Sequence, residues 1–417
     1  MKKPKIAILT IRNSYGYGGV LTSVKKLYKF CEKYFDPTIF YLSFDPKISA
    51  NIKSFNFKNK IRHTNYFGMK AVEIGSRWAF WEPGHYLYSL PLWKKALKDY
   101  DYFIFKSGSC IASYPLIKLN KKFAMWIGTS YQDDRDQRVK KLSYIRKVID
   151  FFAQFKMKKI EKEILSKANY IFSISRNTRK RVDQIIGYKR DDIAVCGFPI
   201  FVKINNKKLS KNKNIIAVGR FSDPRKNFDM LIKAFDKIHK KFLESKLYVV
   251  GKKPDNEILE KYSNLNCYKN ILFTGMLDQD QLKQFYEISD LMLITSYQEG
   301  LGITGLEAMS FGLPVVSTKC GGTSDYVIDD KNGFLVDIND IKNMSEKAIK
   351  ILSSPDLYNQ FSNYALNFIK DNYSQARFES IIKYGLVKTY PELKDLFEEK
   401  DLIRSFDQSE KIQESNL

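Results

Sequence analysis

Histidine and cysteine are scarce in this chain of 417 residues, which holds three of the first and five of the second. The cysteines are scattered, form no CxxC pair and leave an odd one over, so the sequence favours neither a zinc site nor a disulfide framework. A chain without such a framework fits a reducing compartment best.

Long hydrophobic runs are absent as well. No apolar stretch approaches the roughly 18–20 residues that a membrane-spanning helix needs. The short apolar run at 5–11 is strand-like, and no signal-peptide cleavage site follows it. We therefore expect a cytoplasmic protein.

The net charge of the chain is strongly positive, and nearly all of the excess lies in the first half. Residues 1–200 hold 39 Lys and Arg against 16 Asp and Glu, whereas residues 201–417 hold 31 against 30. A basic half suits nucleic acid, an anionic membrane surface or an acidic substrate. A lysine-rich genome is the alternative explanation, but it does not explain why one half alone is basic.

Both halves alternate strand-like and helical patterns. Residues 5–11 read as a buried strand and 20–34 as a helix, and the pattern restarts with a strand at 213–222 and a helix at 227–242. This alternation predicts parallel βαβ units. We expect Rossmann-like domains at 1–200 and 213–375, a polar linker at 201–212, and C-terminal helices with a polar tail at 376–417.

Two carboxylates flank a glycine-broken loop in SYQEGLGITGLEAMSFGLPVVST, residues 296–318. A strand pattern precedes the loop, and a helix is expected from Ile303 until just before Gly312, since Pro314 forbids its continuation. The loop thus leads into a helix N-terminus at the carboxyl end of a parallel strand. Ligands bind at that edge of open α/β sheets, and helix N-terminal amides suit phosphate.

The acidic and basic residues around this loop match the parts of a nucleotide sugar. Glu299 lies on the loop and Glu307 about one turn into the helix, and carboxylates accept hydrogen bonds from diols. A nucleotide sugar has a diol at each end and a diphosphate between. Arg220 and Lys226, which follow an earlier strand, would grip that diphosphate and neutralise the charge on the leaving nucleoside diphosphate.

No metal or other cofactor is expected. Paired aspartates occur at 133–134, 191–192 and 329–330, but they lie on polar loops, and no DxD pair stands in a metal-binding context. The basic residues are therefore expected to stabilise the leaving group in place of Mg²⁺.

The stretch SYQEGLGITGLEAMSFGLPVVSTKCGGTSDYV, residues 296–327, preceded by VGRFSDPRKN and ILFTGML, resembles glycosyltransferase family 4. These are retaining enzymes that use nucleotide sugars and have the GT-B fold. The likeness is strong over about 213–340 and weak elsewhere. It implies two Rossmann-like domains facing across a central cleft, the first binding the acceptor and the second the donor, with a C-terminal helix that is a candidate to cross back.

The resemblance also implies a role for individual residues. Glu299 would contact the transferred sugar, and Glu307 the ribose. The other donor-binding positions implied for the diphosphate and the base are Gly302, Ile303, Thr304, Arg220, Lys226 and, beside the base, Leu277. Gly18 and Gly19, in the glycine loop after the first strand, match the loop that approaches the donor phosphates and the acceptor.

The sequence departs from the family on the acceptor side. Many members carry a histidine after the strand that here reads FAMWIGTS, where this chain has Gly128-Thr129-Ser130. Retaining enzymes of this kind are thought to transfer on one face, with the leaving phosphate helping to deprotonate the acceptor, so a missing base is compatible with activity. The candidates to contact the acceptor are Thr129, Asp133, Asp134 and His85.

A long basic helix is expected over about 139–167, and its mixture of basic and aromatic residues is the most distinctive pattern in the first half of the chain. The segment 135–164 interleaves Lys and Arg with Phe151, Phe152, Phe155 and Met157. This pattern fits an interfacial helix, or equally a helix whose apolar stripe packs on its own domain. The clustered aromatics at 66–93 likewise fit an acceptor pocket, a membrane-facing loop or a core.

The reading that accounts for most of these features is a hexosyltransferase that uses a UDP- or GDP-linked sugar and retains the anomeric configuration. Its acceptor would be an anionic glycan or glycolipid of cell-surface biosynthesis, met at the inner face of the cell membrane. A sugar-nucleotide epimerase or a phosphorylase is the alternative. A nucleic-acid-binding protein is a further alternative, but no groove-reading helix or basic-aromatic sheet motif supports it, and no nucleic-acid partner is expected.

Overall fold

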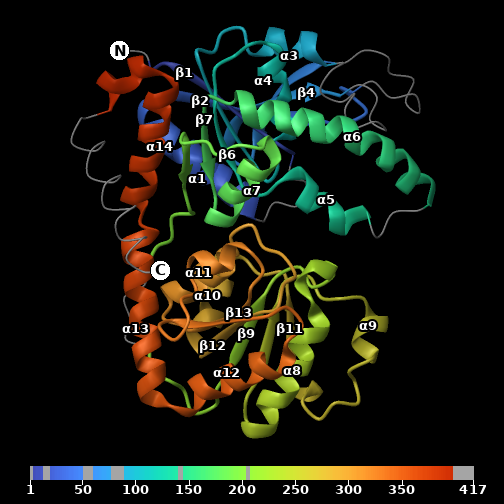
Figure 1. Cartoon of the computed structure of the whole chain (residues 1–417), viewed down its shortest axis with the longest axis vertical. Helices are drawn as coiled ribbons and strands as arrows, with labels where there is room; N and C mark the ends of the chain where they lie inside the picture. The colour runs from blue at the N-terminus through green and yellow to red at the C-terminus, as the bar shows by residue number, and fades with distance from the viewer. Residues whose placement is uncertain are drawn as a thin grey trace. The chain divides into compact units, whose positions relative to one another are not determined.

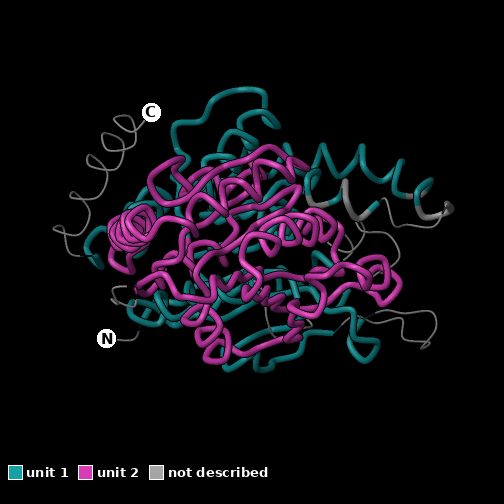
Figure 2. Tube along the Cα trace, turned by 90° about the horizontal axis from the view of Figure 1, so that it is seen from below, with its two compact units in different colours: residues 1–197, 378–417 teal, residues 198–377 magenta. Residues whose placement is uncertain are grey.

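The computed structural model describes residues 3–12, 19–49, 60–76, 89–139, 144–202 and 207–397. The chain divides into two compact units (Figure 2). Unit 1 contains residues 1–197 and 378–417, and unit 2 contains residues 198–377. Each unit is an α/β structure with its own sheet (Figure 1).

In the part of unit 1 that the structure describes, the sheet has eight strands. They are β1 (Lys5–Thr10), β2 (Asp36–Ser43), β3 (Ile61–Tyr66), β4 (Met69–Gly75), β5 (Tyr102–Ser107), β6 (Ala124–Ile127), β7 (Tyr170–Ser173) and β8 (Ile193–Val195). Their order is β3-β4-β2-β1-β5-β6-β7-β8, and every pair is parallel except β3 with β4. The predicted parallel βαβ units are therefore confirmed.

The antiparallel hairpin β3–β4 was not predicted. Its two-residue turn consists of Phe67 and Gly68, with φ of 53° and 90°. Positive φ at both central residues is the geometry that matches the twist of a tight hairpin. Phenylalanine is an unusual residue in that conformation, so this turn lacked the Asn-Gly or Asp-Gly signal.

Helices cover both faces of this sheet. Within the described residues, the α-helices of unit 1 are α1 (Gly19–Tyr34), α3 (Leu90–Ala96), α4 (Tyr114–Lys118), α5 (Tyr131–Val139), α6 (Tyr144–Lys167), α7 (Arg176–Ile186) and most of α14 (Gln375–Thr389). The basic helix expected over about 139–167 corresponds to α6, and α5 precedes it as a further helix that was not predicted (Figure 1).

The C-terminal helix α14 is part of the core of unit 1. The ring of Phe378 lies 5.2 Å from that of Trp126 in β6. The hydroxyl of Tyr390, just beyond α14, accepts a hydrogen bond of 2.9 Å from the backbone N–H of Phe103 in β5. Strands covered on both faces read as near-continuous apolar runs, which is why their sequences show little alternation.

Unit 2 contains a six-stranded sheet whose pairs are all parallel. Its strands are β9 (Ile215–Val218), β10 (Leu247–Val250), β11 (Ile271–Gly275), β12 (Leu291–Ile294), β13 (Val315–Thr318) and β14 (Gly333–Val336). Its α-helices are α8 (Phe228–Lys241), α9 (Asn256–Glu260), α10 (Gln279–Ile288), α11 (Ile303–Ser310), α12 (Ile341–Ser353) and α13 (Pro355–Asn372).

The strands of unit 2 lie in the order β11-β10-β9-β12-β13-β14. From β9 the chain adds β10 and β11 on one side of β9, and it then adds β12, β13 and β14 on the other side. The point between β9 and β12 is thus the reversal point, at which the order of adding strands changes sides. Loops that follow two such strands diverge and leave room for a ligand at their carboxyl ends. In the part of the chain that the structure describes, no helix is both long and apolar enough to cross a membrane.

Candidate functional site

Two loops meet at the reversal point of the unit 2 sheet. The first follows β9, and the second connects β12 to α11. The backbone N–H of Tyr297 donates to the carbonyl of Arg225 at 2.7 Å, and the Thr295 hydroxyl donates to the carbonyl of Lys226 at 2.9 Å. These bonds join the two loops that contain the predicted donor-site residues, although some 70 residues separate the loops in sequence.

Lys226 and Glu299 form an ion pair at this junction. Lys226 Nζ lies 2.5 Å from Glu299 Oε1, which also accepts a 2.6 Å hydrogen bond from the Ser296 hydroxyl. The two side chains are only 21% and 15% exposed. The Lys226 stem lies over Gly219, where a Cβ would come within 3.1 Å of Lys226 Cε. The pair thus places one cation and one carboxylate in a fixed geometry at the sheet edge.

Arg220 is placed differently. Its side chain is 55% exposed, and its guanidinium lies 3.9 Å from Asp223, a distance without a direct hydrogen bond. Arg225 holds Asp223 more closely, at 2.8 Å. Burial opposes ionisation of Asp223, but the hydrogen bonds from Arg225 outweigh it and lower the pKa of this carboxyl. Arg225 therefore shapes the loop, and the exposed Arg220 extends beyond it.

The glycine loop leads into α11 through a left-handed residue. Gly302 has φ 74° and ψ 53° and is the N-cap of α11, which begins at Ile303 as expected. The hydroxyl of Tyr326 donates to the Gly302 carbonyl at 2.8 Å. A Cβ on Gly305 would lie 2.2 Å from that hydroxyl oxygen. Tyr326 thus excludes side chains from both positions and holds the loop against the helix.

The N-terminus of α11 offers unpaired donors by its geometry. The first amides of an α-helix have no acceptor within the helix, so those of Ile303 and Thr304 point out of its end. The helix dipole adds a partial positive charge there. Together with Lys226, this end of α11 forms a site suited to phosphate oxygens.

Glu307 lies farther along α11 and is half-buried. Its Oε2 atom is 3.2 Å from the hydroxyl of Tyr286, which also lies 3.3 Å from the Thr304 carbonyl. Burial, together with the neighbouring Glu307 carboxylate, raises the pKa of Tyr286 far above its usual range. The tyrosine therefore stays a neutral hydroxyl that orients the carboxylate.

Glycines end three adjacent strands at the same edge. Gly219, Gly251 and Gly275 follow or close β9, β10 and β11. A Cβ on Gly251, which has φ 114°, would lie 2.2 Å from the Gly219 carbonyl oxygen. Leu277, two residues after Gly275, is half-buried beyond this edge. The glycines thus let the ends of neighbouring strands approach one another closely, next to the position predicted to lie beside a base.

The acceptor-side candidates lie in unit 1. Gly19 is exposed at the start of α1, after β1. Thr129 follows β6 and its N–H donates to the Gly108 carbonyl at 2.9 Å. The Asp133 carboxylate lies 3.1 Å from the guanidinium of Arg181, so an ion pair already holds it.

Three of the predicted positions have no structural account. Gly18 and His85 lie outside the described residues, and Asp134 lies in α5 with its side chain outside them. Their predicted roles stay predictions.

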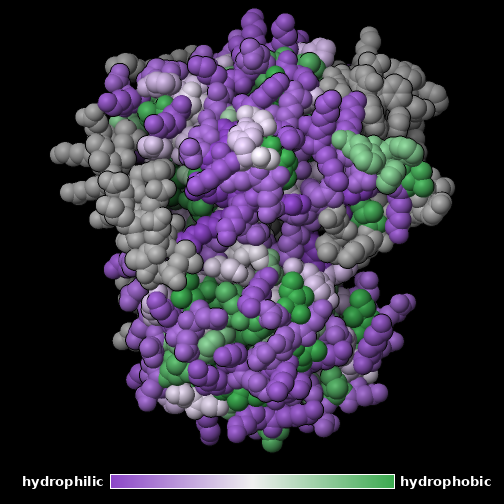
Figure 3. All heavy atoms as spheres, viewed as in Figure 1, coloured by the Kyte–Doolittle hydropathy of each residue, from purple (hydrophilic) through white to green (hydrophobic). Residues whose placement is uncertain are grey.

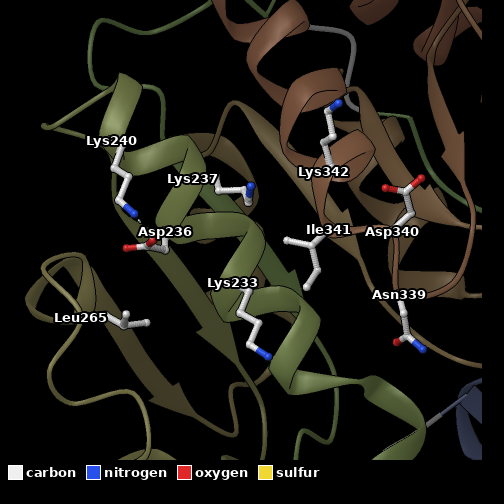
Figure 4. A pocket seen from close by; sticks show the side chains of 9 residues that line it. All are labelled: Lys233, Asp236, Lys237, Lys240, Leu265, Asn339, Asp340, Ile341 and Lys342. Atoms are coloured by element: carbon white, nitrogen blue, oxygen red, sulfur yellow. Dashed lines mark ion pairs between the residues drawn. The ribbon is translucent and has the colours of Figure 1, made fainter.

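Neither a group of metal ligands nor the pocket between α8 and α12 adds a second candidate site among the described residues. Within the described ranges, no group of three His, Cys, Asp or Glu is close enough to hold a metal ion. A shallow pocket of about 680 Å³ lies between α8 and α12, lined by residues that include Lys233, Lys237 and Lys240 (Figure 4). Lys233 and Lys240 pair with aspartates on their own helix at 2.8 and 2.7 Å, and no predicted site residue lines this pocket.

The sequence did not predict the residues whose hydroxyl groups hold the site residues in place. Tyr326, Tyr286 and Ser296 contact Gly302, Glu307 and Glu299 through single hydroxyl groups. The position of Tyr326 in the sequence carries no signal that its hydroxyl will meet a loop 24 residues away. Only Ser296, three residues before Glu299, was close enough in sequence to be noticed.

Comparison with known proteins agrees with this geometry. Residues 201–368 match the family model "Glycosyl transferases group 1". That segment lies entirely within unit 2, and the match confirms the resemblance predicted for about residues 213–340.

A curated relative and two solved structures extend the comparison. The poly(ribitol-phosphate) alpha-N-acetylglucosaminyltransferase of Staphylococcus aureus is 29% identical over 234 residues, covering 55% of this chain and 46% of that protein. The sucrose-phosphate synthase of Thermosynechococcus elongatus has a TM-score of 0.69 at 16% identity, covering 95% of this chain and all of that one. Anabaena HepE in complex with UDP has a TM-score of 0.64 at 14% identity, covering 92% and 98%.

These likenesses differ in what they establish. The structural neighbours confirm the predicted GT-B fold. The chain spans between 44 and 62% of the length of the first curated relatives that it matches.

Proposed function

We propose that this protein is a glycosyltransferase that transfers a hexose-type sugar from a nucleoside diphosphate sugar, with retention, to an anionic glycan or glycolipid. The observation that supports it most is the Lys226–Glu299 pair beside the N-terminus of α11 at the reversal point of the sheet. That edge combines a phosphate site with a carboxylate, and the family match points to the same chemistry.

In the proposed complex, the pyrophosphate lies at the N-terminus of α11, with Lys226 and Arg220 beside it. These cations stabilise the negative charge that develops as the bond between the anomeric carbon and the phosphate oxygen breaks. The acceptor oxygen forms the new bond on the same face of the sugar, and its proton passes to the leaving phosphate. Glu299 accepts hydrogen bonds from the sugar hydroxyls, and Glu307 from the ribose diol.

The base and the sugar of the donor are proposals as well. UDP is the first candidate, because the structural neighbour HepE was solved with UDP bound. An anionic acceptor is supported by the basic first half of the chain and by a relative named for poly(ribitol-phosphate). We place the reaction in cell-surface glycan biosynthesis, at the inner face of the cell membrane, and expect it to need no metal ion.

A thermal-shift panel of UDP, GDP and ADP and their sugars tests the donor site. A ligand at about 100 times its Kd adds about 2.7 kcal/mol to stability, so a bound nucleotide raises the Tm measurably. We expect one nucleotide to stabilise the wild type, and its effect to shrink in Arg220→Ala and Glu307→Ala.

Matched controls are Lys241→Ala and Glu346→Ala, which remove exposed charges from α8 and α12. Both controls should respond to the nucleotide as the wild type does. A wild type that no nucleotide stabilises, or site variants that respond as fully as the controls, would contradict the proposal.

A further inference from the structure

Helix α6 packs against unit 1 along one side only. Met157, Ile160 and Ile164 belong to the hydrophobic core of the unit and are at most 4% exposed. On the opposite side of the same helix, Phe152 and Phe155 are 70% and 60% exposed. Met157 and the phenylalanines, which the sequence pattern grouped together, therefore lie on opposite sides of α6: Met157 is buried and the phenylalanines are exposed.

The exposed aromatic rings form one cluster. The centroid of the Phe151 ring lies 5.5 Å from that of Phe152 and 5.4 Å from that of Phe155. Val148, one turn earlier, is 43% exposed. Figure 3 shows hydrophobic atoms among hydrophilic ones where Figure 1 places α6. A contiguous apolar patch on a protein surface marks an interaction site more often than scattered single residues do.

Basic residues continue the same helix face. Lys158, Lys159 and Lys162 are exposed and lie seven, eight and eleven residues after Phe151. At about 100° per residue, these three lysines point to the same side of the helix axis as Phe151 and Phe155. The exposed face of α6 is thus aromatic for its first turns and basic for the next.

The acidic residues of α6 do not offset these lysines. Glu161 is on the buried side, 2% exposed. Asp150 pairs with Arg135, and Glu163 pairs with Lys118 and Lys167. The face therefore presents apolar rings and positive charge together, which complements acyl chains beneath anionic headgroups.

We infer that the Phe151–Phe152–Phe155 cluster and the lysines after it form the surface by which this protein docks on an anionic lipid bilayer. The rings enter the boundary between headgroups and acyl chains, while the lysines stay at the level of the lipid phosphates. This inference deepens the proposed function, since it names the element that brings the enzyme to a membrane-borne acceptor.

The test uses the full-length protein and co-sedimentation with vesicles of phosphatidylcholine alone or with phosphatidylglycerol added. We expect the wild type to bind the anionic vesicles, and more weakly as salt is raised. The variant Phe151→Ser/Phe152→Ser/Phe155→Ser should lose roughly tenfold or more of its partitioning, because the buried apolar area disappears. Lys158→Glu/Lys159→Glu/Lys162→Glu should lose the preference for anionic lipid.

Control substitutions of the same kinds lie on unit 2. Leu243→Ser removes an apolar side chain that is 71% exposed, and Lys237→Glu/Lys241→Glu/Lys269→Glu reverses three exposed charges. Both controls should bind vesicles nearly as well as the wild type does, and better than the α6 variants. Nucleotide stabilisation is measured on all variants, because its retention separates this inference from the donor site.

Several outcomes overturn the inference. They are a wild type that ignores anionic vesicles, serine variants that bind as the wild type does, and binding that is indifferent to lipid charge. Self-association that the serine substitutions abolish, without any vesicle binding, would show that the face is a protein interface and would overturn it equally.

Discussion

At the scale of single residues, the candidate site depends on pairs that hold each other in place. The Lys226 ammonium and the Glu299 carboxylate each limit the other's freedom, and the Ser296 hydroxyl fixes the same carboxylate oxygen. Preorganised charges of this kind stabilise a transition state without reorganising during the reaction. The Tyr326 hydroxyl does the same for the backbone at Gly302.

Glu299→Gln should separate binding from transfer. The amide keeps the shape of the side chain and can accept the bond from Ser296, but it removes the negative charge that we propose lies beside the sugar. We expect a kcat lower by about 10²–10³-fold, in the range found when one stabilising group is removed from an active site. Nucleotide affinity, measured by calorimetry, should change far less. An unchanged kcat would show that Glu299 is not beside the reacting sugar.

At the scale of elements, α6 serves two surfaces. Its outer face carries the aromatic cluster, and its inner face carries Glu161, whose carboxylate accepts a 2.6 Å hydrogen bond from the N–H of Tyr131 at the start of α5. α5 begins just after Thr129 and contains Asp133. Helix α6, which we propose docks on lipid, thus also holds α5, the helix that contains the acceptor-side candidates Asp133 and Asp134.

The stability of unit 1 should depend on the protonation of Glu161. Burial raises its pKa to about 7, although the amide of Tyr131 opposes the shift. Between the usual carboxyl pKa and about 7, the folded chain holds a proton that the unfolded chain releases, so the free energy of unfolding falls as pH rises through that window.

Glu161→Gln should remove this dependence while preserving the bond to Tyr131. We compare the free energy of unfolding of the variant with that of the wild type. The difference, variant minus wild type, should rise by roughly 3 kcal/mol from a pH below the carboxyl pKa to a pH above 7. Denaturant unfolding at both pH values measures the difference. Parallel pH profiles of the two proteins would contradict the prediction.

At the scale of the whole molecule, the chain completes unit 1 only after it has built unit 2. Residues 378–397 return to unit 1, where Phe378 packs on Trp126 and the Tyr390 hydroxyl donates to the carbonyl of Lys122 at 2.6 Å. The α14 helix lies close to the sheet because Gly385 has no side chain. A Cβ there would lie 2.2 Å from Phe172 in β7.

Gly385→Ala should therefore destabilise the protein. The added methyl group overlaps a ring in a packed core, where such changes cost about 1–3 kcal/mol. The control is Gly108→Ala, also in unit 1, whose new Cβ would meet nothing closer than 3.9 Å. Thermal unfolding should show a clear loss of Tm for the first and a small change for the second. Equal Tm values would mean that α14 adjusts freely.

The sequence by itself determined the features that local pattern encodes. Strand runs, helix periodicity and the glycine loop before Ile303 depend on neighbours within a few residues, so β12, α11 and the order of the elements were all predictable. The carboxyl-edge position of the predicted donor residues followed as well, since parallel sheets bring their loops to one edge.

Tertiary structure alone decided which of these residues touch and which side chains face outward. Lys226 meets Glu299 across 73 residues, and Tyr326 supports Gly302 across 24. The exposure of Phe152 and the burial of Met157 depend on which side of α6 the rest of unit 1 covers. Helical spacing specifies the faces of a helix, whereas its packing partners decide which face remains exposed, and those partners come from distant parts of the chain.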